Sequence, residues 1–261
     1  MSDTFDTITV DCDDHLAILR LNQPDRLNAL NEPMRQEIMA AVDMLAEDDA
    51  VRALVICGNS EKAFVAGADI SEFASRTPEE QTEAYQRRRV YEVLAAFPKP
   101  SLAAIHGYCY GGGCELALAC DMRIADSTAS FGQLEVRLGL VPAAGGTQRL
   151  ARLVGYGHAF KLAATGDTID AAEALRIGLV EEVVESGQHL ARATELAGRM
   201  TRWSPVAVRL IKELVSQSSE VPLARGIELE KAAFLTAFAS EDGREGVTAF
   251  TEKRRAKFVG K

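Results

Sequence analysis

An α/β fold is predicted by two features of this chain: apolar runs of strand length alternate with segments of helical periodicity, and glycine or proline separates them. The first two apolar runs, Thr7–Val10 and Leu16–Leu21, predict a hairpin of strands. Met34–Glu47 repeats its apolar residues at helical spacing, and Val51–Cys57 is a continuous apolar run that predicts the next strand.

The middle of the chain continues the alternation. Thr77-Pro78-Glu79-Glu80 is a helix start, because threonine caps, proline suits the first helical position and acids favour the positive end of the helix dipole. We expect this helix to run to Phe97, where the following Pro98 stops it. Ser101–His106 and Met122–Ala125 then predict two further strands.

The chain becomes mostly helical after Gly145. Asp170-Ala-Ala-Glu173 resembles a capping box, and Gly178 suits the end of the same helix. Ser204-Pro205 starts another helix, and the residues up to about Lys257 form amphipathic helices with large apolar side chains. Such a region is typical either of a core or of a surface that docks on another subunit.

Composition and charge exclude several classes of function. The formal net charge of −9 would repel DNA and RNA, so we expect no nucleic-acid partner. Five cysteines without a CxxC pair predict neither a disulfide framework nor a metal site. The most apolar stretch, Ser101–Cys120, is interrupted by three glycines and Glu115, and the acidic start lacks a secretory signal. We therefore expect a cytoplasmic protein without a membrane partner.

Lys62–Ile70 is a loop of small residues that follows a predicted strand. Gly67 permits a backbone turn that other residues resist, and such a turn directs the amide of Ala68 toward a ligand. Taken alone, the segment is more typical of a tight connection in which Asp69 caps a short helix, with Glu72 at the capping-box position, because turns of small residues are common.

Gly111-Gly112-Gly113 precedes the apolar helical stretch Cys114–Cys120. Glycines at a helix start let a substrate approach the backbone, and the free N–H groups there favour negative charge. A glycine run alone is also typical of a flexible loop or close helix packing. Glu115 adds weight to a functional interpretation, because a carboxylate in an apolar helix is costly without a partner or a purpose.

Glu135 ends the segment Phe131–Glu135 and lies 20 positions after Glu115. This spacing leaves room for a helix and a returning strand between the two acids. Taken alone, Glu135 is typical of a surface residue, and only its place after the two glycine motifs suggests a site.

These segments together resemble the enoyl-CoA hydratase/isomerase (crotonase) family. The resemblance covers nearly the whole chain and includes Leu27–Leu30, Ile105–Tyr108, Pro142–Leu150 and Ala174–Val180. It implies a crotonase-like (ClpP-like) spiral of ββα units over residues 1–200, which carries the active site, and a C-terminal helical trimerisation region over residues 201–261. It also implies a homotrimer, or a hexamer made of two trimers.

The resemblance also implies roles for particular residues. Ala68 and Gly112 would supply the backbone N–H groups of an oxyanion hole for the thioester carbonyl of an acyl-CoA. Coenzyme A is then part of the substrate, and no separate cofactor is implied. The family pattern places coenzyme A near Arg26, Leu27, Ala66, Asp69, Ile70, Phe250 and Lys253. The last two would reach the coenzyme A of a neighbouring subunit, and Ser71 stands where some relatives carry a lysine.

In family hydratases, the residue that matches Glu135 exchanges a proton and the residue that matches Glu115 orients the water. Both glutamates are present here, which favours an enoyl-CoA hydratase, a carbon–oxygen lyase, because other branches often lack one or both. A Δ3-Δ2 enoyl-CoA isomerase, in which Glu135 acts alone, is the alternative.

Two alternatives stay open at this stage, and the histidines suggest no site. A specialised hydratase for dehydroadipyl- or carnitinyl-CoA fits equally, because the residues of the acyl pocket are not placed. The alternative outside enzymes is an acyl-CoA-binding scaffold on the same fold. His106 is predicted to be a core or loop residue, and the four histidines form no cluster in the sequence.

Overall fold

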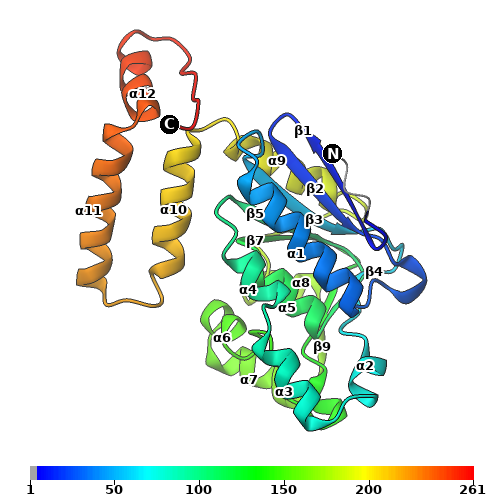
Figure 1. The fold of residues 1–261 in the computed structure, drawn as a ribbon. Coiled ribbons are helices and arrows are strands. Elements are labelled where there is room, and N and C mark those ends of the chain that lie inside the picture. The colour runs from blue at the N-terminus through cyan, green and yellow to red at the C-terminus, as the bar shows by residue number, and fades with distance from the viewer. Residues whose placement is uncertain (1–4) are drawn as a thin grey trace.

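A six-stranded sheet forms the central layer of the computed structural model, which describes residues 5–261 (Figure 1). Its first two strands form the predicted antiparallel hairpin, and the later strands run parallel to the second. In spatial order the strands are β1 (Ile8–Asp13), β2 (Leu16–Leu21), β3 (Ala53–Gly58), β5 (Ser101–Ile105), β7 (Met122–Asp126) and β10 (Glu182–Val184).

A second sheet of four short strands lies beyond the ends of the first. Its members are β4 (Ala63–Val65), β6 (Tyr108–Tyr110), β8 (Ser130–Gly132) and β9 (Thr168–Asp170). The chain passes from β3 to β4, from β5 to β6 and from β7 to β8, so each turn places one strand in each sheet. This repeat confirms the predicted α/β spiral of ββα units.

Among residues 5–261, nine α-helices cover the two sheets. They are α1 (Glu32–Glu47), α2 (Ile70–Ala74), α3 (Pro78–Gln86), α4 (Val90–Ala95), α5 (Gly112–Ala119), α6 (Arg149–Val154), α7 (Tyr156–Thr165), α8 (Ala171–Arg176) and α9 (His189–Met200). Helix α1 packs on α4, α4 packs on α5, and α9 packs on the central sheet. All eight residues of α5 are buried, so any polar side chain on this helix needs a partner or a cavity.

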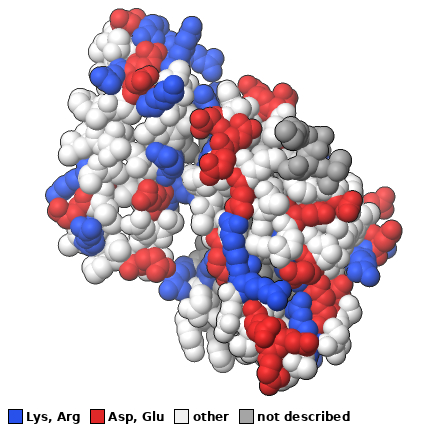
Figure 2. All heavy atoms as spheres, in the orientation of Figure 1, with Lys and Arg blue, Asp and Glu red and all other residues white. Residues whose placement is uncertain are grey.

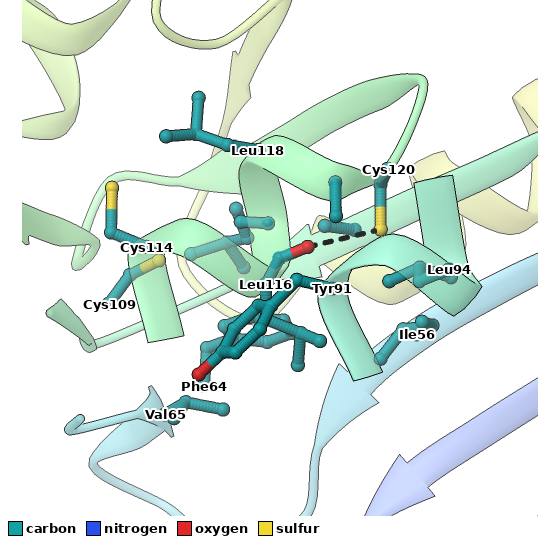
Figure 3. Close-up of a cluster of buried hydrophobic side chains, with 14 of the residues drawn as sticks. Ile56, Phe64, Val65, Tyr91, Leu94, Cys109, Cys114, Leu116, Leu118 and Cys120 are labelled. Atoms are coloured by element: carbon teal, nitrogen blue, oxygen red, sulfur yellow. Dashed lines mark hydrogen bonds between the residues drawn. The ribbon is translucent and has the colours of Figure 1, made fainter. Parts of the chain in front are cut away.

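The hydrophobic core surrounds α5. Figure 3 shows Leu116 of this helix among Ile56, Phe64 and Leu94, which come from β3, β4 and α4. Each of these side chains has no accessible surface. Helix α5 is therefore held from several directions, and residues on it are fixed relative to both sheets.

The single helix expected from Thr77 to Phe97 is wrong. Thr77 caps α3 as predicted, and Glu80 completes a capping box there, but α3 ends at Gln86 and α4 begins only at Val90. The two helices differ in burial: α3 buries none of its residues, whereas α4 buries most of its own. A straight continuation could not satisfy both environments, and the residues between the helices are extended.

Two predicted capping boxes are only half formed. Asp69 caps α2 through the Ser71 amide, and Asp170 caps α8 through the Glu173 amide. The acids expected to close the boxes are used elsewhere, since the Glu72 carboxylate accepts hydrogen bonds from Arg35 and from the Glu32 amide. A tertiary contact therefore replaces the motif at Glu72, whereas Glu173 pairs with Arg176 of its own helix.

The C-terminal helices α10 (Pro205–Gln217), α11 (Leu223–Ala239) and α12 (Glu241–Thr251) extend from the core as an arm (Figure 1). Helix α11 buries none of its residues, and Phe234 and Phe238 are exposed. Figure 2 shows broad uncharged areas along this arm between scattered charges. Within residues 5–261, no helix is long and apolar enough to cross a membrane.

Candidate active site

The Ala68 amide lies at a turn that follows β4. The neighbouring residues pair with Leu30: the Leu30 amide donates to Gly67 O (2.9 Å), and the Asp69 amide donates to Leu30 O (3.2 Å). This bridge leaves the Ala68 N–H without an acceptor in the described part of the chain. Gly67 has φ +136°, a value that side chains disfavour, which explains the glycine at the turn.

The Gly112 amide opens helix α5. As the first helical residue, Gly112 has no intrahelical acceptor for its N–H. Gly111 sets the turn, with φ +48° and an amide bonded to Gly132 O at 2.8 Å. A Cβ built on Gly112 would lie 3.4 Å from the Ala68 nitrogen, so the two amides are adjacent.

Glu115 lies in the first turn of α5 and is 3% exposed. One of its oxygens, Oε1, accepts hydrogen bonds from the Ala144 amide (2.7 Å) and the Gly146 amide (2.9 Å). Burial raises the pKa of the Glu115 carboxyl, while these two amides and the charges of Arg89 and Arg149 oppose that rise. The site thus buries a carboxylate but supplies donors to its ionised form.

Glu135 begins the 3₁₀ helix η2 (Glu135–Leu138), directly after β8. A Cβ built on Gly111 would lie 3.1 Å from its Oε1, which places the carboxylate beside the glycine turn. Burial, followed by the negative charge of Glu115, raises the pKa of Glu135 to about 7. The two glutamates therefore interact, although they come from different segments.

Gln133 supports the Glu135 carboxylate. This buried side chain has one terminal amide atom 3.2 Å from both carboxylate oxygens of Glu135, and the orientation that satisfies the whole amide places nitrogen there. Gln133 lies inside the motif Phe131–Glu135, so the motif contained a site residue that sequence analysis did not name.

A cavity of about 430 Å³ unites these groups, since Ala68, Gly112, Glu115 and Glu135 all line it. Much of the remaining wall is apolar: Met39, Ile70, Phe73, Leu138, Leu140 and Val141. A mostly apolar cavity with a few convergent polar groups is the usual form of a small-molecule site. The cavity can hold an acyl group with its polar end at the two amides.

Tyr91 is a cavity residue that sequence analysis missed. A Cβ built on Gly112 would lie 2.9 Å from its hydroxyl, so the phenol lies against the glycine turn. Figure 3 shows Tyr91 beside Val65 and Leu116. The prediction of one continuous helix concealed this residue, because the start of α4 sets the direction of its side chain.

Five of the residues expected near coenzyme A lie close together. The Ala66 amide donates to Leu27 O at 3.1 Å, and Arg26 pairs with Asp69 at 3.1 Å. Ala66 and Ile70 line the cavity, whereas the other three flank it. The Asp69 carboxylate also caps α2, so this residue has a structural role as well.

Phe250 and Lys253 lie elsewhere. Phe250 lies in the last turn of α12 on the helical arm, Lys253 follows the end of that helix, and neither lines the cavity of its own chain (Figure 1). Phe250 is 85% exposed. Within one chain, the structure therefore does not bring these two residues to the cavity.

The histidines do not enter the site. His106 lies next to β5, and its ring stacks on His189 at 4.5 Å between centroids. His189 in turn contacts Asp126 at 3.0 Å, a contact between distant segments that the sequence did not show. Neither histidine lines the cavity. Within residues 5–261, no group of His, Cys, Asp and Glu side chains could hold a metal ion.

A family model described as enoyl-CoA hydratase/isomerase matches residues 12–261 of the chain. The chain belongs to the enoyl-CoA hydratase/isomerase family. It is 43% identical to a crotonyl-CoA hydratase of Syntrophomonas wolfei over 258 residues, which cover 98% of this chain and 99% of the relative. It is 42% identical to a short-chain-enoyl-CoA hydratase of Clostridium acetobutylicum, with 92% of each chain covered.

Solved structures of the family have the same fold. The crystal structure of an enoyl-CoA hydratase from Bacillus anthracis matches with a TM-score of 0.93 and 38% identity, covering 98% of this chain and 100% of that one. A second enoyl-CoA hydratase structure, from Geobacillus kaustophilus, matches with a TM-score of 0.94 and 41% identity, covering 98% and 99%. The family fold therefore extends over both the sheets and the helical arm.

Proposed function

We propose that this protein is an enoyl-CoA hydratase, which reversibly adds water to a 2-trans-enoyl-CoA and forms a 3-hydroxyacyl-CoA. One observation carries the proposal: Glu115 and Glu135 face one cavity beside the adjacent amides of Ala68 and Gly112. The crotonyl-CoA and short-chain-enoyl-CoA hydratases among its relatives support this choice.

The two amides activate the thioester. When water attacks C3, negative charge develops on the thioester oxygen and forms an enolate. Within residues 5–261 the N–H groups of Ala68 and Gly112 have no other acceptor, and we expect both to donate to that oxygen. One such donor is worth about 3 kcal/mol of transition-state stabilisation. Because the donors are main-chain groups, small residues at both positions leave room for the substrate.

The two glutamates handle the protons. Glu115, held by the amides of Ala144 and Gly146, accepts a proton from water while the water oxygen bonds to C3. Glu135, whose pKa of about 7 keeps a protonated form available, donates its proton to C2. The pair ends with the one proton it started with, now on Glu115, and its return to Glu135 completes the cycle.

The substrate and the assembly follow from the same proposal. Coenzyme A enters as part of the substrate, so the enzyme uses no separate cofactor. Phe250 and Lys253 contact the coenzyme A bound to a neighbouring subunit. The exposed apolar face of α11 supports a homotrimer, or a hexamer made of two trimers.

The test is the hydration of crotonyl-CoA, followed by the loss of absorbance of the conjugated thioester. We expect Glu135→Gln and Glu115→Gln each to lower kcat by about 10²-fold or more, because each removes one acid–base group. Glu173→Gln changes a partly exposed acid on α8 that does not line the cavity, and it serves as the control, with unchanged kcat. Hydration at the wild-type rate by either active-site variant would refute the proposal.

Incubation with a 3-enoyl-CoA separates hydration from isomerisation. A hydratase with both glutamates yields the 3-hydroxyacyl-CoA from the 2-enoyl form, whereas an isomerase yields only the shifted double bond. An isomerase would also tolerate Glu115→Gln, since Glu135 alone would move its proton. A product that contains no added water would favour isomerisation.

A further inference from the structure

A single peptide group connects Arg89 with Glu115. Arg89 Nη1 donates to the carbonyl oxygen of Ala143 at 2.8 Å. The Ala144 amide, which belongs to the same peptide group, donates to Glu115 Oε1 at 2.7 Å. In a trans peptide the C=O and N–H point in opposite directions, so fixing the oxygen also fixes the direction of the N–H.

Aromatic rings hold Arg89 in place. Its guanidinium lies over the ring of Tyr85 at 4.5 Å and near the ring of Tyr91 at 5.4 Å. The Glu92 carboxylate lies 3.8 Å from Arg89 Nη1, which is farther than the Ala143 oxygen, and its side chain is more than half exposed. The preceding Arg88 also lines the cavity, but its guanidinium pairs closely with Asp43. Arg89 instead has its short hydrogen bond to the Ala143 carbonyl.

A second arginine binds the same loop, although through a different peptide group from the one that holds Glu115. Arg149 Nη1 donates to Ala144 O at 2.9 Å, and the Gly146 amide donates to Glu115 at 2.9 Å. Two successive carbonyls of the loop thus bind arginines while two of its amides bind Glu115. A loop held in this way presents its N–H groups to one carboxylate oxygen without rearrangement.

We propose that Arg89 is a positioning residue for hydration: it fixes and polarises the peptide between Ala143 and Ala144, which then holds the Glu115 carboxylate in the orientation that the water needs. This inference rests on the proposed function. It also explains why α3 and α4 are separate helices, since the extended segment between them delivers Arg89 to the loop.

The charge of Arg89 has a consequence for pH dependence. The charged and titratable groups that face Glu115 come from three places: Arg89 and Tyr91 near the α3–α4 junction, Glu135 in η2 and Arg149 in α6. Burial raises the pKa of Tyr91, so this group stays neutral in the working range. The charge of Arg89 lowers the pKa of Glu115, so removing Arg89 raises that pKa. The acidic limb of the pH profile of activity then moves to higher pH.

The test compares Arg89→Met and Arg89→Lys with Arg176→Met, which removes an exposed arginine outside the cavity. For Arg89→Met with crotonyl-CoA we expect kcat to fall about tenfold, KM to change less, and the acidic limb of kcat/KM to move up by about half a pH unit. Arg89→Lys keeps the charge and retains the position of the limb. Arg176→Met matches the wild type.

A double variant separates this role from general support of the fold. If Arg89 acts through Glu115, adding Arg89→Met to Glu115→Gln lowers kcat by less than about twofold further. A full additional tenfold loss, or an unmoved acidic limb in Arg89→Met, would overturn the inference. Should the wild type hydrate no enoyl-CoA, the proposed function fails instead. An infrared titration of the Glu115 carboxyl, with and without Arg89→Met, then decides the inference alone by whether the pKa rises.

Discussion

Replacing Gly112 by alanine tests the oxyanion hole directly. The added methyl carbon would lie 3.4 Å from the Ala68 nitrogen and 2.9 Å from the Tyr91 hydroxyl. An oxyanion must bind about 2.7–3.1 Å from each amide, so the methyl group crowds the space that the thioester oxygen needs. The variant therefore impairs the hole while both glutamates remain.

The size of the effect follows from these contacts. Losing one oxyanion donor costs about 3–4 kcal/mol in the transition state, which lowers kcat by about 10²- to 10³-fold. The close contact is with the end of the Tyr91 side chain, and such overpacking typically costs about 1–3 kcal/mol of stability. Activity should therefore fall much further than stability, because the donors act mainly on the transition state.

The assay measures kcat with crotonyl-CoA and the melting temperature of each variant. Two glycines provide matched controls. Gly113→Ala places its Cβ 2.6 Å from the Val65 Cβ, within a strand that cannot shift easily, so it should lower the melting temperature more than Gly112→Ala. Gly157→Ala meets nothing within 4 Å and should leave both quantities unchanged.

Two results would refute this reasoning. Wild-type kcat in Gly112→Ala would mean that the thioester oxygen binds elsewhere. A fall in melting temperature equal to that of Gly113→Ala would mean that Gly112 is required for packing rather than for catalysis.

Three further predictions concern the proton pair, a buried turn and the arm. The pH profile of kcat/KM should be bell-shaped and identical in both reaction directions. The value of kcat/KM falls above an apparent pKa near 7, where Glu135 loses its proton, and it falls in acid, where Glu115 gains one. A profile that is flat between about pH 5 and pH 9 would contradict this prediction. Asn28→Ala should lower the free energy of unfolding by about 2–4 kcal/mol in denaturant titrations, because buried Asn28 donates to the carbonyls of Ala63 and Phe64; a change below about 0.5 kcal/mol would contradict it. Phe234→Glu should shift the protein toward monomers in size-exclusion chromatography with light scattering, and elution at the wild-type mass would count against the proposed use of α11.

Some of the fold was predictable because its causes are local. The helix cap at Thr77 and the turn at Gly67 depend on a few neighbouring residues, and both are present as expected. The buried face of α1 depends only on the spacing of apolar side chains. Glu115 and Glu135 could also be identified from the sequence, because each lies in a motif of consecutive residues.

The chain by itself therefore determined the elements, the family resemblance and the identity of the candidate acids. Only the tertiary structure decided that helices α3 and α4 separate, that Arg89 reaches Ala143, and that burial and Glu115 raise the pKa of Glu135. These features arise from contacts between segments far apart in the chain. Local patterns fix backbone conformation, whereas the environment of a charge depends on which distant groups pack around it.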